Sequence, residues 1–384
     1  MNRPATTRIV ALSIGLVGAL LVGELILRGT ARWMGEWGVR LVTWDPFATK
    51  IMPMGEHGYR PRPGSAFKYA NGTVATTNRQ GARGDTVLIP KPAGRVRVVL
   101  LGGSSMHGYG ADDGESIGAA MTRLADSAFG PGRIDVVNLA YDGYDSYQER
   151  ERLIADGLRF APDILVVHTG INDVRNARQP HLELPGPDPR TLIYRPDTER
   201  LKRERANGGP SVATYLKHWL FLARLPGVIR SGLADRTAGR PAGKTAGGPA
   251  TPVTGYPEAL DYFERNERSI DSIAARIGAP VLFSVSPSAL LLRGAPSTTS
   301  PPSYWLADAA TTQAYRDRIG DRLALVVASR QADGRPVKLI RPTLPASAFL
   351  DDCHLTAAGN LTMARIFLDE LAPWITTHHS SEAP

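Results

Sequence analysis

The feature that most constrains this chain is a series of five short apolar runs that alternate with segments of helical spacing. The apolar runs occupy residues 96–101, 134–139, 164–167, 281–285 and 337–340, and the helical segments occupy 115–129, 147–160, 260–277, 308–329 and 357–371. Short continuous apolar runs are typical of strands that are buried on both faces. Strands separated by helices pair in parallel, because each return connection needs about the length of a helix. The sequence therefore predicts an α/β protein of three layers (α/β/α), in which a five-stranded parallel sheet lies between two layers of helices.

The rest of the chain is organised around this α/β domain, which we place at residues 94–375. Residues 33–93 are rich in Gly, Pro and aromatic residues without a helical period, which predicts an irregular N-terminal cover or small β-elements. An insertion at 176–254 interrupts the sheet pattern after the third strand, and its last part, 234–254, has the Ala/Gly/Pro/Thr composition of a linker. Residues 376–384 are predicted to be a disordered tail.

Polar residues and glycines follow three of the predicted strands. Gly102-Gly103-Ser104 follows the first strand, Gly143 comes after the second, and Asn172 comes after the third. Ligands of parallel sheets bind beyond the carboxyl ends of the strands. Glycines before a serine permit a sharp turn that exposes the hydroxyl, and backbone N–H groups with a side-chain amide can stabilise a developing negative charge. Taken singly, these residues are equally explained as a loop serine, a turn glycine and a helix cap.

Asp351 and His354 stand three residues apart, just before the last predicted helix. A histidine beside a carboxylate can act as a general base, because the carboxylate fixes its tautomer and stabilises the imidazolium. The alternative is that Asp351 caps a turn and His354 is exposed. No Gly-Lys-Ser/Thr follows the first glycines, which disfavours a phosphate loop, and a single cysteine cannot build a Cys-based zinc site. We expect no cofactor and no metal.

Together, these segments resemble the SGNH/GDSL serine hydrolase family, in its membrane-anchored bacterial type. The order of the family's blocks is matched by a Gly-x-Ser turn, an Asn-x-x-x-x-Gly segment, a Gly-x-Asn-Asp segment and an Asp-x-x-His segment before a final helix. The resemblance covers residues 75–176 and 256–372, and residues 77–84 look like a segment found upstream of the first block in anchored members. The resemblance to the family implies a flavodoxin-like fold.

The resemblance also implies roles for individual residues. Ser104 corresponds to the catalytic nucleophile, His354 to the general base and Asp351 to the acid that orients the histidine. The backbone N–H groups of Ser104 and Gly143 and the side chain of Asn172 correspond to the oxyanion hole.

The chain departs from the family pattern at three positions. Gly103 stands where the family name has Asp, Met106 stands where Thr is frequent, and Ala140 replaces a common Gly in the second block. None of these changes removes a catalytic group.

Three neighbouring residues offer competing assignments, namely Ser105, Asp352 and His107, the last because it could approach the site from just after the turn. Ser105 is the nucleophile if the turn is shifted by one residue, and Asp352 is the alternative orienting acid. We interpret His107 as a surface residue at a helix start, and Cys353 as a small packed side chain.

The N-terminus carries a separate signal. Residues 9–27 form an apolar run that would span about 28 Å as a helix, close to the hydrocarbon thickness of a bilayer. Arg3 and Arg8 precede it, as in a signal anchor or a signal peptide. We predict an uncleaved signal anchor over residues 1–32, and therefore a single-pass inner-membrane protein whose catalytic domain faces the periplasm or the outside.

The net charge of +8 is confined to one region. Residues 190–244 contain 12 Lys/Arg and 4 Asp/Glu, which accounts for the whole excess, and the rest of the chain is balanced. This distribution argues against a nucleic-acid partner, because the α/β domain carries no basic excess. It favours a contact of residues 190–244 with an anionic lipid or glycan surface.

The expected function is hydrolysis of O-acyl esters on a cell-envelope glycan or lipid through an acyl-serine intermediate. An O-acetyltransferase for an envelope polysaccharide would use the same residues, with a sugar hydroxyl instead of water as acceptor. A third possibility is a carbohydrate-binding pseudoenzyme, which the presence of the serine, asparagine and Asp-His set disfavours.

The predicted topology can be tested with a reporter fusion. Alkaline phosphatase fused after Pro384 should be active, because the short N-terminal tail stays in the cytoplasm while the long domain is translocated. An inactive phosphatase together with an active cytoplasmic reporter at the same position would reverse the topology.

Overall fold

The computed structural model describes residues 5–30, 51–53, 59–69, 71–178, 222, 225–226, 254–292, 294 and 306–381. The chain divides into two compact units, one formed by 1–49 with 199–244 and the other by 50–198 with 245–384. The second unit carries the sheet and is described first. The predicted basic contact segment at 190–244 and most of the predicted insertion lie outside the described residues.

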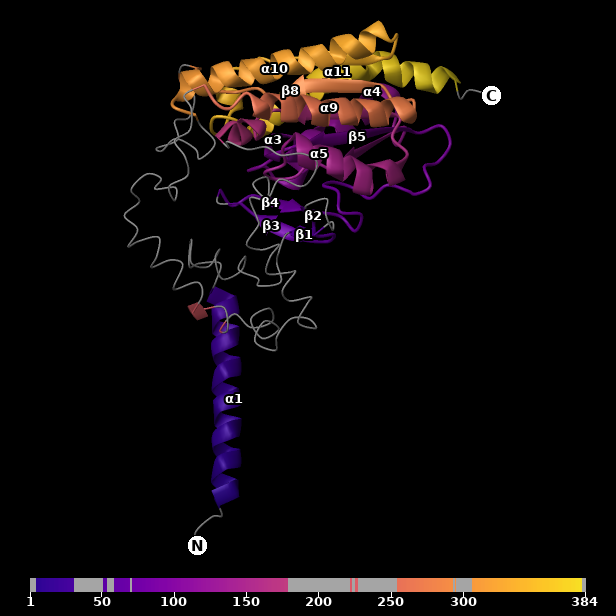
Figure 1. Ribbon diagram of the computed structural model, residues 1–384. Coiled ribbons are helices and arrows are strands. Elements are labelled where there is room, and N and C mark those ends of the chain that lie inside the picture. Colours follow the sequence, from indigo (N-terminus) through magenta and orange to yellow (C-terminus); the bar gives the residue numbers. More distant parts are fainter. Residues whose placement is uncertain are drawn as a thin grey trace. The chain divides into compact units, whose positions relative to one another are not determined.

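The predicted five-stranded parallel sheet is confirmed (Figure 1). Its strands are β5 (Val96–Gly102), β6 (Ile134–Asn138), β7 (Ile164–Thr169), β8 (Val281–Val285) and β9 (Val337–Ile340). Their order across the sheet is β6-β5-β7-β8-β9, and each neighbouring pair is parallel. All carboxyl ends therefore lie along one edge, with β5 between β6 and β7.

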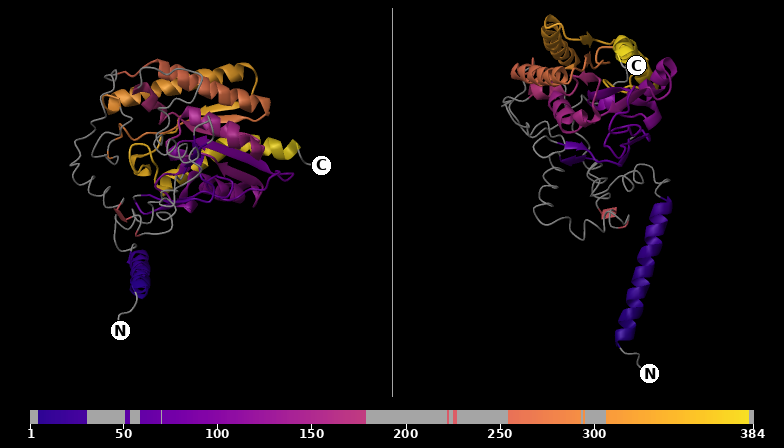
Figure 2. Two further views of the ribbon diagram at one scale, coloured as in Figure 1. Left: turned by 60° about the horizontal axis from the view of Figure 1, so that its bottom comes forward. Right: turned by 90° about the vertical axis from the view of Figure 1, so that its right-hand side faces the viewer.

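Helices cover both faces of the sheet, as the right-hand view of Figure 2 makes clear. One layer contains α4 (Ile117–Phe129) and α11 (Ala357–Ser381), and the other contains α5 (Ser146–Arg152), α9 (Glu258–Arg276) and α10 (Ala309–Ala332). Alternate residues of each strand face opposite layers: Val98 and Leu100 pack with α4 and α11, and Val99 and Leu101 pack with the other layer. This explains why the strands are apolar throughout.

Two helices differ from their predicted bounds. The segment predicted as one helix over 147–160 is α-helical only to Arg152, and then forms a π turn (η4, Leu153–Gly157) and a 3₁₀ turn (η5, Leu158–Phe160). Buried ion pairs of Asp156 with Arg152 and Arg60 tie this segment to the N-terminal region, which local spacing cannot reveal.

The last helix, α11, continues to Ser381 with Pro373 inside it. The expectation of a disordered tail over 376–384 is therefore wrong for most of that segment. A proline removes only one hydrogen bond from a helix, and the apolar side chains of Leu371 and Ile375 on either side of Pro373 remain buried in the core.

The region before the sheet forms small β-elements. Two antiparallel pairs are present, β1 (Ile51–Pro53) with β2 (Tyr59–Pro61), and β3 (Ala66–Lys68) with β4 (Val74–Thr76). Short helical turns complete the unit, and these are α3 (Ser104–His107), η3 (Asp113–Glu115), η6 (Asp173–Arg178) and η7 (Ala346–Ala348).

The first unit contains helix α1 (Ala5–Thr30). Its portion Ser13–Thr30 is long and apolar enough to cross a membrane, a property that signal sequences share. Large apolar side chains on all sides of this portion are exposed, which fits a membrane anchor or a signal sequence better than a core helix.

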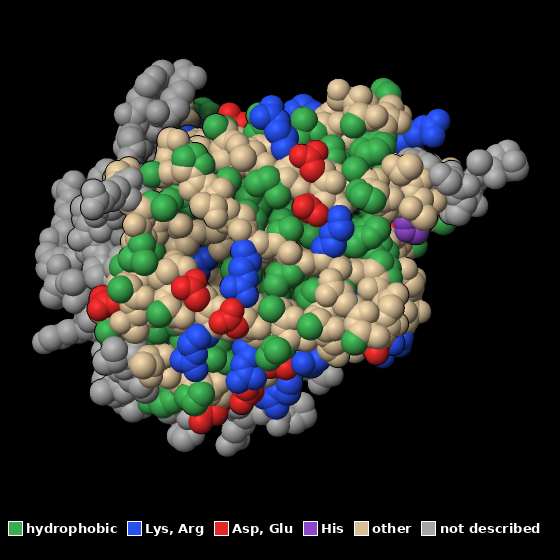
Figure 3. All heavy atoms as spheres, turned by 90° about the horizontal axis from the view of Figure 1, so that it is seen from above, with side chains coloured by type: hydrophobic (Ala, Val, Ile, Leu, Met, Phe, Trp, Pro, Cys, Tyr) green, Lys and Arg blue, Asp and Glu red, His purple; other side chains and the backbone are tan. Residues whose placement is uncertain are grey.

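Charged side chains are interspersed on the face of the molecule drawn in Figure 3. Basic and acidic groups alternate there instead of forming a field of one sign. Ion pairs between partly exposed side chains include Arg322 with Glu264 and Arg341 with Asp321.

Packing of the sheet can be tested at β8. Leu282→Ala should lower the free energy of unfolding by about 2–5 kcal/mol, because Leu282 is fully buried and its removal leaves a cavity. Leu325→Ala is the matched control, since Leu325 is 55% exposed, and should change stability by less than about 0.5 kcal/mol. Thermal unfolding of the full chain in mild detergent measures both variants, and equal effects would contradict the core assignment.

Candidate active site

Ser104 stands at a sharp turn between the end of β5 and α3. Gly103 has an extended backbone, and Gly108 ends α3 in the left-handed region with φ of 91°. A Cβ on Gly102 would lie 2.7 Å from the carbonyl oxygen of His168, and a Cβ on Gly103 would lie 2.6 Å from Asn172 Nδ2. Neither position can hold a side chain without displacing a neighbour.

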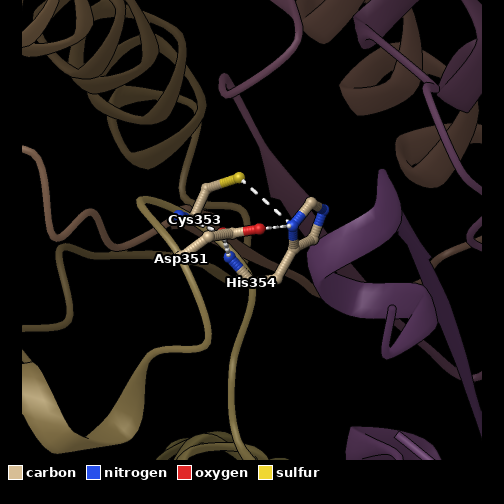
Figure 4. A group of neighbouring side chains, drawn as sticks. All are labelled: Asp351, Cys353 and His354. Atoms are coloured by element: carbon tan, nitrogen blue, oxygen red, sulfur yellow. Dashed lines mark hydrogen bonds and ion pairs between the residues drawn. The ribbon is translucent and has the colours of Figure 1, made fainter. Parts of the chain in front are cut away.

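His354 and Asp351 are held in a tight loop between η7 and α11. Asp351 Oδ1 accepts hydrogen bonds from the backbone N–H groups of Cys353 and His354, and Leu350 N–H donates to the His354 carbonyl oxygen. Asp351 Oδ2 lies 2.6 Å from His354 Nδ1, the contact that Figure 4 displays. On the other side of the ring, His354 Nε2 lies 2.8 Å from Ser104 Oγ. The structure thus brings together three residues separated by up to 250 positions.

The environment of His354 favours its protonated form. Burial by itself lowers the pKa of His354, while the hydrogen bond and the charge of Asp351 raise it above its usual value. Burial also raises the pKa of Cys353, so this thiol is uncharged at neutral pH. The Asp351 carboxylate is therefore the partner that stabilises the imidazolium. Burial raises the pKa of Asp351, but the hydrogen bonds that it accepts and the charge of His354 together outweigh burial and lower that pKa.

Asn172 and Gly143 lie in the two loops next to the serine turn. Asn172 Nδ2 donates one hydrogen to the Tyr144 carbonyl oxygen at 2.7 Å, which leaves its second hydrogen for another acceptor. Gly143 has φ of 81°, and within the described residues its N–H has no protein acceptor. The N–H of Ser104, the first residue of α3, also lacks one among those residues. Three donors of the kind that an oxyanion needs therefore lie around one turn.

A buried carboxylate joins the two donor loops. Asp173, the neighbour of Asn172, accepts hydrogen bonds from the backbone N–H and the hydroxyl of Ser146, at 3.2 and 2.6 Å. Asn176 donates to Asp145 at 2.9 Å from the same side. Burial, with the charge of Asp145 adding to it, raises the pKa of Asp173 to about 7. These contacts fix the position of Asn172 relative to Gly143.

The competing serine has a different environment. The hydroxyl of Ser105 is buried and lies 3.3 Å from Nε2 of His168, whose Nδ1 is 3.0 Å from the Ser284 hydroxyl. Burial, helped by the positive charge of Arg316, lowers the pKa of His168 to about 3, so this histidine is neutral. The contact is an interior link that anchors α3 to β7 and β8.

The other competing residues are also placed by the structure. His107 is buried, and its Nδ1 lies 3.0 Å from the Ala140 carbonyl oxygen. Our interpretation of His107 as a surface residue is therefore wrong, because the four-residue helix α3 packs inward on all sides. The ion pair of His354 is formed with Asp351, while the backbone carbonyl of Asp352 accepts the Ala289 N–H. Cys353 is buried, with Sγ 3.8 Å from His354 Nδ1.

Among the described residues, one group of side chains could offer ligand atoms to a metal ion. It consists of Asp351, Cys353 and His354. Its histidine Nδ1 is already hydrogen-bonded to Asp351 and its thiol is protonated. Metal binding would have to displace both protons, so the arrangement serves the Asp-His pair.

The sequence did not point to two residues of the site, Tyr109 and Arg83. Tyr109 lies with its ring stacked on the His354 ring, with centroids 4.2 Å apart, and Tyr69 lies behind Tyr109 at 4.5 Å. Arg83 is buried and donates to the carbonyl oxygens of His107, Gly108 and Ala111. It belongs to the 77–84 segment that the resemblance had singled out, but only the fold shows that this segment holds the loop after Ser104.

The fold and the site define a class of protein, namely an α/β protein with a Ser-His-Asp arrangement at the carboxyl edge of a parallel sheet. The model of the GDSL-like lipase/acylhydrolase family matches residues 100–361, and the chain belongs to this family. No curated protein matches the chain.

Several solved structures are similar to the chain. One is a catalytic variant of Axe2, an acetylxylan esterase from Geobacillus stearothermophilus, at 15% identity over 73% of this chain and 95% of the other, with a TM-score of 0.40. TesA has 15% identity over 72% and 98%, with a TM-score of 0.38. A GDSL-like lipase from Bacteroides thetaiotaomicron has 15% identity over 73% and 88%, with a TM-score of 0.35.

The Asp351–His354 contact predicts a pH dependence. If neutral His354 acts as the base, kcat/KM rises with pH through the raised pKa of His354. Asp351→Asn removes the carboxylate that raises this pKa, so the acid limb should move to lower pH while the maximal rate falls by about 10²–10⁴-fold. Asp352→Asn is the control and should leave the limb in place. If the acid limb shifts in Asp352→Asn and not in Asp351→Asn, the carboxylate that orients His354 is Asp352, and the assignment to Asp351 is wrong.

The Tyr109 ring predicts a second, smaller effect. A cation over an aromatic face gains about 0.5–1 kcal/mol, so Tyr109→Leu should shift the acid limb to lower pH by about 0.4–0.7 units. Tyr109→Phe keeps the ring and should keep the limb. Profiles of kcat/KM against pH measure both variants. If Tyr109→Phe shifts the acid limb as far as Tyr109→Leu does, the ring contact is not the cause of the shift.

Proposed function

We propose that the protein is a serine ester hydrolase in which Ser104 is the nucleophile. The observation that carries the proposal is a hydrogen-bonded series. Ser104 Oγ lies 2.8 Å from His354 Nε2, and His354 Nδ1 lies 2.6 Å from Asp351 Oδ2. In these positions His354 can accept the serine proton while Asp351 stabilises the imidazolium.

The proposed reaction has two steps. Ser104 Oγ attacks the ester carbonyl carbon and transfers its proton to His354 Nε2, and the imidazolium then protonates the leaving alcohol oxygen as the acyl–oxygen bond breaks. Water next attacks the acyl-serine ester and gives its proton to His354, and the proton returns to Ser104 as the carboxylic acid leaves. The N–H groups of Ser104 and Gly143 and the Asn172 amide would bind the oxyanion in both steps.

The substrate class follows from chemistry and location. We propose O-acyl groups on a cell-envelope glycan or lipid, because α1 would keep the domain at a membrane, with the catalytic unit on the periplasmic or outer side of the inner membrane. The basic segment 190–244 is proposed to contact an anionic surface there. Acetate release from an O-acetylated glycan, measured with and without a second glycan as acceptor, separates hydrolysis from O-acetyl transfer. Release that depends on the acceptor glycan would overturn the hydrolase assignment in favour of a transferase.

The oxyanion assignment gives a quantitative expectation. Asn172→Ala should lower kcat by about 10²–10³-fold with little change in KM, because the amide would act on charge that develops only in the transition state. Gln331→Ala is a control that removes an exposed amide on α10, outside the proposed hole, and it should retain most of the activity. Unchanged kcat in Asn172→Ala would exclude the amide from the oxyanion hole.

A further inference from the structure

We propose that a second pocket on the carboxyl edge of the sheet binds the anionic group of a sugar-sized ligand. The pocket lies beyond the ends of β8 and β9, and β8 is two strands away from the strand that leads to Ser104. Its volume is about 280 Å³, close to the lower limit of about 300 Å³ that is typical of small-molecule sites. Its polar lining consists of Ser286, Ser288, Gln313, Arg316, Asp317, Arg341 and Thr343.

Two buried groups give the pocket donors for an anion. Arg316 reaches it from α10 and is only 3% exposed, and its Nη2 donates to the Ser286 carbonyl oxygen, which fixes the guanidinium at the end of β8. The Ser286 hydroxyl is 2% exposed and has no hydrogen-bond partner within the described part of the chain. A buried hydroxyl without a partner destabilises the fold, and a ligand oxygen would relieve this cost.

The charges of the lining favour a negative ligand. The lining contains two arginines, Arg316 and Arg341, and one acid, Asp317, which accepts a hydrogen bond from Gln313. Arg341 also pairs with Asp321, but Asp321 is 72% exposed and such pairs contribute little. An arginine fork matches the oxygens of a carboxylate or a phosphate, and Gln313 and Thr343 suit the hydroxyls of a sugar.

The pocket is joined to the proposed catalytic loop. Ala289 lies between the lining residues Ser288 and Leu291, and its N–H donates to the carbonyl oxygen of Asp352, the neighbour of Asp351. A polymer with an acylated unit at Ser104 would therefore extend along the sheet edge toward the pocket. This last step rests on the proposed function, and it makes an acidic glycan the preferred substrate.

Direct binding tests the pocket independently of catalysis. The full chain carrying Ser104→Ala, in mild detergent, is titrated with galacturonic acid, galactose and inorganic phosphate, and ligand-observed NMR measures the dissociation constants. Galacturonic acid should bind and galactose should not. Displacement by phosphate identifies the oxyanion itself as the recognised group, and lack of displacement restricts the site to sugar carboxylates.

Matched arginine variants locate the binding. Arg341→Gln should weaken galacturonic acid binding at least about fivefold, less than the loss of a buried charged hydrogen bond because the Arg341 side chain is 46% exposed. Arg335→Gln should not, although Arg335 is equally exposed at 45% against 46% and also lies near an exposed aspartate. Equal affinities in the two variants, or equal binding of galactose and galacturonic acid, would overturn the proposal.

Kinetics test the link to the substrate. On the active protein, Arg341→Gln should lower kcat/KM about fivefold for O-acetylated polygalacturonate and leave it unchanged for O-acetylated xylan. Equal losses on both polymers would overturn the link. If no ester is hydrolysed at all, the proposed function fails, while the binding titration still decides the pocket.

Discussion

The contact between Gly103 and Asn172 is the constraint on which the rest of the site depends. A Cβ at position 103 would meet the Asn172 amide nitrogen at 2.6 Å and the Tyr144 carbonyl oxygen at 2.9 Å. The loops that follow β5, β6 and β7 therefore meet at one point with no spare volume. Because these strands are neighbours and parallel, residues distant in sequence converge there without any special connection.

The region before the sheet contributes to this arrangement instead of merely covering it. Arg83 binds three carbonyl oxygens of the loop after Ser104, and Asn71 donates to the Gly110 carbonyl oxygen at 2.6 Å. The loop held in this way carries Tyr109 onto the ring of His354. The N-terminal region thus helps to hold the proposed general base in place from a distance of about 270 residues in the chain.

The strands were predictable from the sequence because burial on both faces leaves a continuous apolar run, and each predicted strand lies within two residues of the observed one. Ser104, Asp351 and His354 were candidates because their residue types can carry chemistry, and their roles were implied by the resemblance of the ordered segments to the serine hydrolase family. Tyr109 and Arg83 were not identified from the sequence, because an aromatic residue and an arginine in loops have no periodic or spacing signal. His107 and the extension of α11 past Pro373 were misjudged for the same reason, since both depend on packing by distant segments.

The central claim is that Ser104, made nucleophilic by His354, forms an acyl-enzyme. The most direct measurement is labelling of the full chain with a fluorophosphonate probe, followed by mass spectrometry of the modified peptide. The account predicts one modified residue, Ser104, with labelling slowed strongly in His354→Ala and abolished in Ser104→Ala. Labelling of Ser105, or no labelling of the wild-type chain, would contradict it.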